Sequence, residues 1–127
     1  MPTNDESTAL KIATEERDGV VIVALAGELD LAGSDEVVAA LDEAAARAPE
    51  CLVVDLGQLR YMDSSGIHAL LRAKERADEQ GHRLAIVRSP ALERIIELTK
   101  LEPTLEVVDD PAELGLTPPE EDKRGDL

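Results

Sequence analysis

The stretch Cys51–Leu56, which reads CLVVDL, is a short and nearly continuous apolar run. A strand with one solvated face alternates apolar and polar residues, whereas a strand that is buried on both faces stays apolar throughout, as in parallel sheets. We therefore predict a strand at the centre of a parallel sheet here, and we expect the rest of the chain to build outward from it.

Two strand-like segments precede this run. Leu10–Glu16 and Val20–Ala26 are rich in Val, Ile and Thr, which are residues favoured in strands. Between them stands Asp18-Gly19, a dipeptide that tolerates positive φ and favours a tight hairpin. The two segments are therefore predicted to pair in antiparallel fashion.

One helix is predicted before the central run in the chain and another after it. Ser34 can cap a helix whose apolar residues recur at helical spacing until Pro49 stops it. A second helix is predicted over Ser65–Gln80, with apolar residues on one side, mostly charged residues on the other, and Gly81 as its terminating residue. Leu84–Val87 then has the pattern of another strand.

The C-terminal elements continue this alternation. Ser89 followed by Pro90 supplies an N-cap and a proline at the first helical position, which predicts the start of a third helix. Leu105–Val108 has the pattern of a last strand, and Ala112–Leu116 is consistent with one more helical turn. An initial hairpin followed by alternating helices and strands predicts a single α/β domain with a mixed sheet flanked by helices.

The chain length fits one domain with two tails. The sequence has 127 residues, and a domain typically takes about 100 to 200. Residues 1–9 and 117–127 are polar and acidic, and such segments lack the apolar residues needed for a core. We therefore expect a flexible N-terminal tail over 1–9, the domain over 10–116, and an acidic, disordered C-terminal tail over 117–127.

The charge and the rare residue types exclude several classes of function. With 13 basic and 28 acidic residues, the net charge is −15, so a phosphate backbone is repelled and no direct nucleic-acid partner is expected. One Cys and two His are too few for a disulfide or a zinc site, and no metal or cofactor is expected. The N-terminus lacks signal-peptide features and no apolar run approaches ~18 residues, which predicts a cytoplasmic protein without membrane contact.

Most of the side chains that could bind a ligand or take part in a reaction lie in three loops at the carboxyl ends of the predicted strands. They are Gly27–Ser34, Gly57–Ser65 and Arg88–Pro90, and α/β sheets build their sites at such positions. In the second loop, residues 63–65 place a carboxylate and two hydroxyls where free backbone N–H groups of the next helix favour an anion. The simpler interpretation is that one of these residues only caps the helix, and the residues alone leave both interpretations open.

Two other reactive side chains are expected to have no chemical role. Cys51 opens its strand at the amino end, opposite the edge where α/β sites form, so we expect a buried or half-buried thiol. His68 lies one helical turn after Ser65, but no triad-like arrangement surrounds it, and it is predicted to be a surface residue.

Three short motifs point to a known family. They are GELD at residues 27–30, MDSSG at 62–66 and SPA at 89–91. In this order and approximate spacing they resemble the STAS domain of bacterial anti-sigma factor antagonists, and DSSG after an aliphatic strand is the most specific of the three. The resemblance spans about Leu10–Val108 and implies a STAS-like fold, in agreement with the mixed sheet inferred from the pattern.

The resemblance also implies a phosphorylation switch in a protein-binding module that is monomeric and not an enzyme. Ser65 is then the phosphoacceptor, supported by Asp63, Ser64 and Gly66. The implied partners are an anti-sigma factor with serine kinase activity, sequestered by the unphosphorylated protein so that a sigma factor is released, and a serine phosphatase that resets the switch. The implied partner-binding residues are Glu28, Asp30, Tyr61, Met62, Asp63, Ser64, Ser65 and Ser89.

Two alternatives remain open on the sequence. A receiver domain would bind Mg²⁺ through Glu28 and Asp30 and accept phosphate on Asp55, although the initial hairpin and Leu56 after the acceptor argue against it. The second alternative keeps the STAS fold but makes it a scaffold or sensor module of a stress-signalling assembly. For Asp30, contact with a basic side chain of the partner and simple solvation of its loop both remain open.

Overall fold

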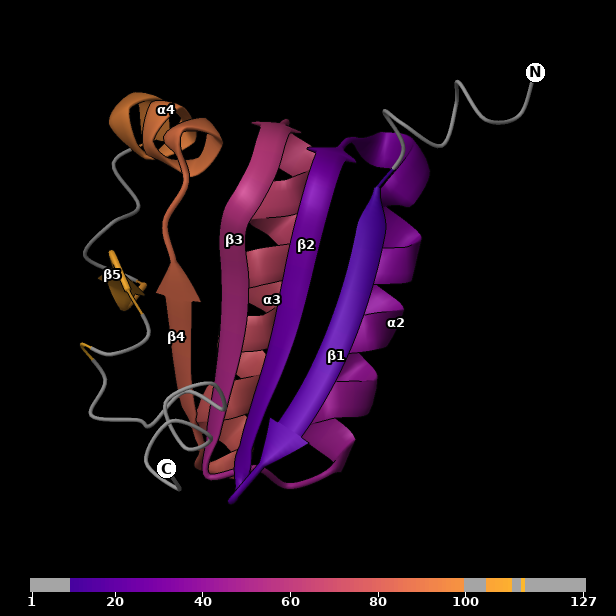
Figure 1. The fold of residues 1–127 in the computed structure, drawn as a ribbon, viewed down its shortest axis with the longest axis vertical. Coiled ribbons are helices and arrows are strands. Elements are labelled where there is room, and N and C mark those ends of the chain that lie inside the picture. The colour runs from indigo at the N-terminus through magenta and orange to yellow at the C-terminus, as the bar shows by residue number, and fades with distance from the viewer. Residues whose placement is uncertain (1–9, 100–104, 111–112, 114–127) are drawn as a thin grey trace, which may run out of the picture.

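The computed structural model describes residues 10–99, 105–110 and 113. This part of the chain forms a five-stranded mixed sheet with three helices (Figure 1). The elements are β1 (Lys11–Arg17), β2 (Val20–Leu29), α2 (Leu31–Ala46), β3 (Cys51–Met62), α3 (Ser64–Gln80), β4 (Arg83–Val87), α4 (Pro90–Thr99) and β5 (Val107–Val108).

The sheet has the predicted centre and the predicted hairpin. Its strand order is β1-β2-β3-β4-β5, with β1 antiparallel to β2 and all later neighbours parallel. Asp18 and Gly19 turn the chain between β1 and β2 at φ values of 54° and 83°, as expected for a tight hairpin. The strand that begins at Cys51 lies in the middle, so the prediction from the apolar run is confirmed.

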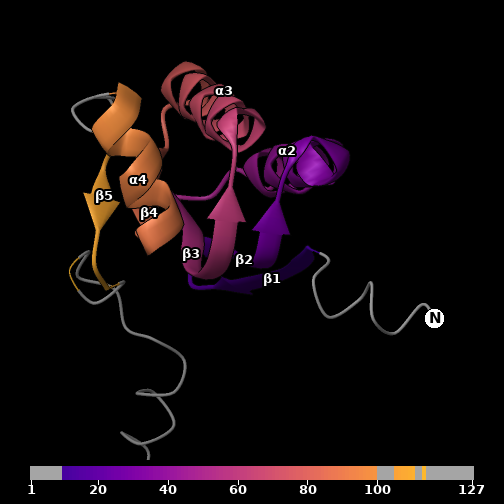
Figure 2. The same cartoon turned by 90° about the horizontal axis from the view of Figure 1, so that it is seen from above.

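Both faces of the first half of β3, Cys51–Leu56, are buried, which explains the continuous apolar sequence there. Figure 2 shows α2 and α3 side by side over one face of the sheet. Leu52 and Val54 of β3 point into the main core on this side, whereas Cys51 and Val53 belong to a second apolar cluster with residues of β4 and β5. The alternation of the two sets along β3 places them on opposite faces.

Strands β2 and β3 are longer than the pattern predicts, and two of the expected loops are correspondingly short. The predicted strands end at Ala26 and Leu56, but the observed ones continue to Leu29 and Met62. Two register shifts explain the difference, because β3 carries an additional residue at each of them relative to β2. Such bulges let a strand absorb residues like Gly57 that break the apolar pattern.

The first helix also begins earlier than predicted. Its N-cap is Asp30, whose carboxylate accepts the backbone N–H of Ala32 at 3.1 Å. Ser34, which the sequence suggested as the cap, lies inside the helix, where its buried hydroxyl donates to the carbonyl of Leu31 at 3.0 Å. The prediction for Ser34 is therefore wrong, because a serine can satisfy its hydroxyl within a helix as well as at its end.

The other helix boundaries follow the sequence closely. Asp63 caps α3, and Gly81 ends that helix in the left-handed conformation at φ 82°. Ser89 accepts the backbone N–H of Leu92 at 3.1 Å, and Pro90 is the first residue of α4, as predicted. The last strand is shorter than predicted, since only Val107–Val108 pair with β4.

Several predictions fall on residues outside the described part. Both tails, at 1–9 and 117–127, lie outside it, as does most of the helical turn predicted at 112–116. Among the helices that the structure describes, none combines the length and the apolar character that crossing a membrane requires.

Candidate functional site

Two helices start side by side at one end of the sheet. Residues Glu28 and Leu29 of β2 pair with Tyr61 and Met62 of β3, and each strand leads through a single aspartate into a helix. This arrangement brings the GELD and DSSG motifs together, although they are more than 30 residues apart in the chain.

Asp63 connects the starts of both helices. Its carboxylate accepts the backbone N–H and the hydroxyl of Ser65, at 2.9 and 2.5 Å. The pKa of Asp63 is lowered, first by the hydrogen bond from the Ser65 hydroxyl and further by backbone N–H groups that include that of Leu31 at the start of α2. Burial acts against this shift. The carboxylate is therefore ionised at neutral pH and holds the Ser65 side chain.

Ser65 is presented at the second position of α3, half-buried and with its hydroxyl donating to Asp63. Ser64, one residue earlier, is exposed. A serine hydroxyl that is held by an ionised carboxylate has an acceptor for its proton in place, which is what a group that accepts a phosphoryl group needs.

Gly66 is required by packing. A Cβ at this position would lie 2.8 Å from Cγ of Met62 and 2.9 Å from Cδ2 of Leu29. Both side chains are buried beneath the start of α3. The absence of a side chain at Gly66 lets the helix sit directly on the ends of β2 and β3, and this close contact fixes where Ser65 lies.

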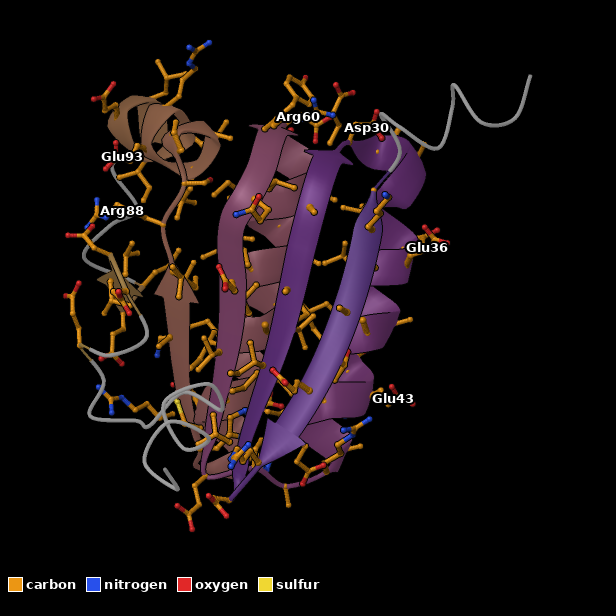
Figure 3. The ribbon with its side chains drawn as sticks, viewed as in Figure 1. Asp30, Glu36, Glu43, Arg60, Arg88 and Glu93 are labelled. Carbon is orange, nitrogen blue, oxygen red and sulfur yellow. The ribbon has the colours of Figure 1, made fainter. Side chains whose placement is uncertain are left out.

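The predicted partner-binding residues divide into surface and buried groups. Tyr61 is 49% exposed, and Glu28 and Asp30 are half-buried. Figure 3 shows Asp30 at the end of the molecule where β2 and β3 end. Met62 and Ser89, by contrast, are only 5% and 2% exposed, because one fills the core and the other caps α4. Their side chains have almost no surface to offer a partner.

The structure adds one apolar feature that the sequence analysis missed. Leu31, the first residue of α2, is 76% exposed and borders a groove of about 420 Å³ between α2 and α3. The sequence did not predict that Leu31 is exposed, because a residue in the first turn of a helix can face either the core or solvent. The lining residues are Leu31, Ser34, Val38, Ser65, His68, Ala69, Leu71, Arg72 and Glu75.

A larger cleft of about 650 Å³ lies away from Ser65. It is lined by residues that include Lys11 on β1, Gln58 on β3 and Pro90 on α4. None of its lining residues belongs to the DSSG motif. Size alone therefore does not identify the candidate site, whereas the hydrogen-bonded serine and the joined motifs do.

Cys51 and His68 lie as predicted. Cys51 is buried at the start of β3, and burial raises the pKa of its thiol, so a nucleophilic thiolate is disfavoured there. His68 is exposed on α3.

The receiver-domain alternative is wrong. A receiver has a flavodoxin-like sheet of order 2-1-3-4-5, whereas here β1 is an antiparallel strand at the edge. Asp55 accepts the backbone N–H of Gly57 at 2.9 Å in the bulged part of β3. Within the described ranges, no group of three or more His, Cys, Asp and Glu residues is arranged to hold a metal ion.

Comparisons with known proteins agree with this description. A family model for the STAS domain matches residues 11–114. The chain is 36% identical over 94 residues to the anti-sigma F factor antagonist of Paenibacillus polymyxa, covering 72% of this chain and 80% of that protein. It is 35% identical over 97 residues to the anti-sigma-F factor antagonist RsfA of Mycobacterium tuberculosis, covering 74% and 76%. The crystal structure of an anti-sigma factor antagonist from Mycobacterium paratuberculosis has a TM-score of 0.76 and 27% identity, covering 84% of this chain and 91% of that one.

Proposed function

The chain belongs to the STAS domain family, and we propose that it acts as an anti-sigma factor antagonist whose binding is switched by phosphorylation of Ser65. The observation that carries the proposal is the serine of the DSSG motif, held by the Asp63 carboxylate where the two motif-bearing strands end. The names of its relatives supply the class of partner, an anti-sigma factor.

The phosphoryl donor in this proposal is ATP bound to an anti-sigma factor with serine kinase activity. The γ-phosphoryl group passes to Oγ of Ser65, and ADP leaves as the bond to the γ-phosphorus breaks. The hydroxyl proton is lost, with the carboxylate of Asp63 as its nearest acceptor. In phosphoryl transfer most of the catalysis is positioning and charge stabilisation, so the role of this chain is to hold its hydroxyl in place for the kinase.

The docking surface surrounds Ser65. Leu31 and Tyr61 offer exposed apolar area, while Glu28 and Asp30 bring negative charge to the same end of the sheet. A complementary partner presents an apolar side chain next to basic ones, and charge complementarity of this kind raises the association rate and fixes the register.

Phosphorylation weakens this contact. A phosphoserine adds about −1.5 to −2 charges beside the exposed Leu31. In the complex this dianion would have to lose its water against the apolar side chain of the partner, and this desolvation cost opposes binding. Because the charge lies at the start of α3, the domain itself tolerates it. A serine phosphatase then restores the binding form.

A labelling experiment tests the switch. Purified protein is incubated with ATP, Mg²⁺ and the cognate anti-sigma factor, and one phosphate is expected on Ser65. The matched controls are Ser65→Ala, which should stay unlabelled but bind the partner, and Ser64→Ala, which should be labelled normally.

Three outcomes would contradict parts of the proposal. Labelling that disappears in Ser64→Ala instead of Ser65→Ala would move the site by one residue. Labelling without any added kinase would mean that the chain has catalytic activity of its own. Tight binding to an anti-sigma factor that never phosphorylates the chain and does not depend on Ser65 would favour a scaffold or sensor module.

A further inference from the structure

Four polar side chains of α3 line the groove, and the first three of them, Ser65, His68 and Arg72, precede the acidic Glu75. Ser65, His68 and Arg72 are separated by three and four residues and all line the groove between α2 and α3. This spacing places side chains one above the other along a helix. The α2 wall, by contrast, contributes only uncharged residues to the lining: Leu31, Ser34 and Val38.

The basic side chains of this face differ from the others on the same helix. Lys74 contacts Asp78 at 2.7 Å, and Arg76 contacts Asp42 at 3.0 Å. Within the described part of the chain, neither His68 nor Arg72 forms an ion pair or a side-chain hydrogen bond. In a protein with a net charge of −15, such unpaired basic groups beside a candidate phosphorylation site are noteworthy.

The position of Asp63 determines where a phosphate on Ser65 can go. In the unphosphorylated protein the Ser65 hydroxyl donates to the Asp63 carboxylate at 2.5 Å. Phosphorylation removes this donor and puts a second anion in its place, and two anions at such a distance repel each other strongly. The phosphate must therefore rotate away from Asp63, and the groove side offers the basic side chains of His68 and Arg72.

Helix geometry brings these two basic side chains within reach of the phosphate. Long side chains on a helix lean toward its N-terminus, so His68 and Arg72 lean toward Ser65. Arginine donates in a planar fork that matches a phosphate, and such charged hydrogen bonds are stronger than neutral ones. Glu75, the other charged residue of the lining, competes for Arg72 with a single charge against the nearly two charges of the phosphate.

We propose that His68 and Arg72 form an intramolecular clasp for the phosphate on Ser65. This inference rests on the proposed function and deepens its regulation. In the clasped state the phosphate and the Arg72 side chain lie along the α3 wall of the groove, whose other wall includes Leu31. Phosphorylation then does more than add charge to the docking surface, because it also fills part of the groove that a partner would enter.

The clasp predicts that acidic substitutions imitate phosphorylation poorly. The carboxylate in Ser65→Asp is shorter than a phosphoserine and carries a single charge, so it cannot span two helical turns to Arg72. Ser65→Asp should therefore weaken anti-sigma factor binding less than true phosphorylation does.

The test uses protein with phosphoserine installed at position 65 during translation, so that neither kinase nor partner is needed. At low ionic strength, the change in Tm on phosphorylation is compared in the wild type, Arg72→Gln, and the control Lys74→Gln, which removes the same charge from outside the groove. We expect the change to be about 2 to 4 °C more favourable in the wild type and in Lys74→Gln than in Arg72→Gln. Arg72→Lys should retain part of the difference, and the Nε–Hε resonance of Arg72 should shift on phosphorylation.

Equal changes in Tm for all variants, together with an unshifted Arg72 resonance, would overturn the clasp. That result would leave the proposed function intact, because the cost of desolvating a phosphate opposes binding without any clasp. Conversely, failure of the unphosphorylated protein to bind any anti-sigma factor would refute the proposed function without affecting the measured contact between phosphate and arginine.

Discussion

Replacing Gly66 by alanine tests whether the DSSG motif needs its glycine for packing. The added Cβ would lie 2.8 Å from Cγ of Met62, 2.9 Å from Cδ2 of Leu29 and 3.0 Å from Cε of Met62. Non-bonded carbon atoms prefer about 3.5 to 4.0 Å, so both buried side chains must shift. Overpacking of this kind costs about 1 to 3 kcal/mol.

The higher helix propensity of alanine opposes this loss of stability. Alanine is favoured over glycine in a helix by up to about 1 kcal/mol, which offsets part of the clash. Because two of the contacts are under 3.0 Å, we place the clash in the upper part of the overpacking range, at about 2 to 3 kcal/mol. The expected net loss is then about 1 to 2 kcal/mol, which lowers Tm by roughly 5 to 10 °C in a domain of this size. Thermal melts followed by circular dichroism, together with urea titrations, measure both quantities.

Gly33 in α2 provides the matched control. A Cβ there would meet the end of the flexible Leu10 side chain at 3.1 Å, so Gly33→Ala should be neutral or slightly stabilising. In the Met62→Ala background the penalty of Gly66→Ala should shrink, because the nearest clashing atom is gone. If Gly66→Ala melts as high as Gly33→Ala, the packing argument for the motif is refuted.

Three further predictions concern charged and reactive groups at the site and in the core. Asp30→Ala removes the cap of α2 and should lower the free energy of unfolding by about 1 kcal/mol. Asp30→Asn keeps the cap and should lower only the affinity for the partner, by about 1 to 3 kcal/mol. Thermal melts measure the first effect, and calorimetry with the anti-sigma factor measures the second. The lowered pKa of Asp63 gives stability that is present above the unfolded pKa of about 3.9 and is lost as pH falls through the lower folded value. NMR titration should find this pKa closer to its usual value in Ser65→Ala, and no change would contradict the assigned cause. Cys51, buried and with a raised pKa, should react with thiol reagents at neutral pH only as fast as the domain opens, and rapid labelling of the native protein would contradict its burial.

The order of elements could be read from the sequence, but the ends of β2 and β3 could not. Apolar continuity identified the central strand because a strand that is buried on both faces has no solvated positions. The same rule ended that strand at Leu56, since Gly57 and Gln58 break the pattern. The observed strand continues through register shifts against β2, and such bulges depend on pairing between segments that are far apart in the chain. The sequence of either strand alone does not contain that information.

The roles of the motif residues could not be read from the sequence alone either. Asp, Ser and Gly are favoured at helix starts for capping and for backbone freedom, and they are also the residues that a phosphorylation site uses, so residue type alone could not separate the two roles. For Asp63 the geometry combines helix capping with a hydrogen bond to the Ser65 hydroxyl. The carboxylate that caps α3 is also the group that holds the Ser65 hydroxyl, and it reaches the first backbone N–H of α2 as well. The phosphate that we propose on Ser65 would therefore disturb a contact shared by both helices, and we expect the resulting structural change in the groove between them.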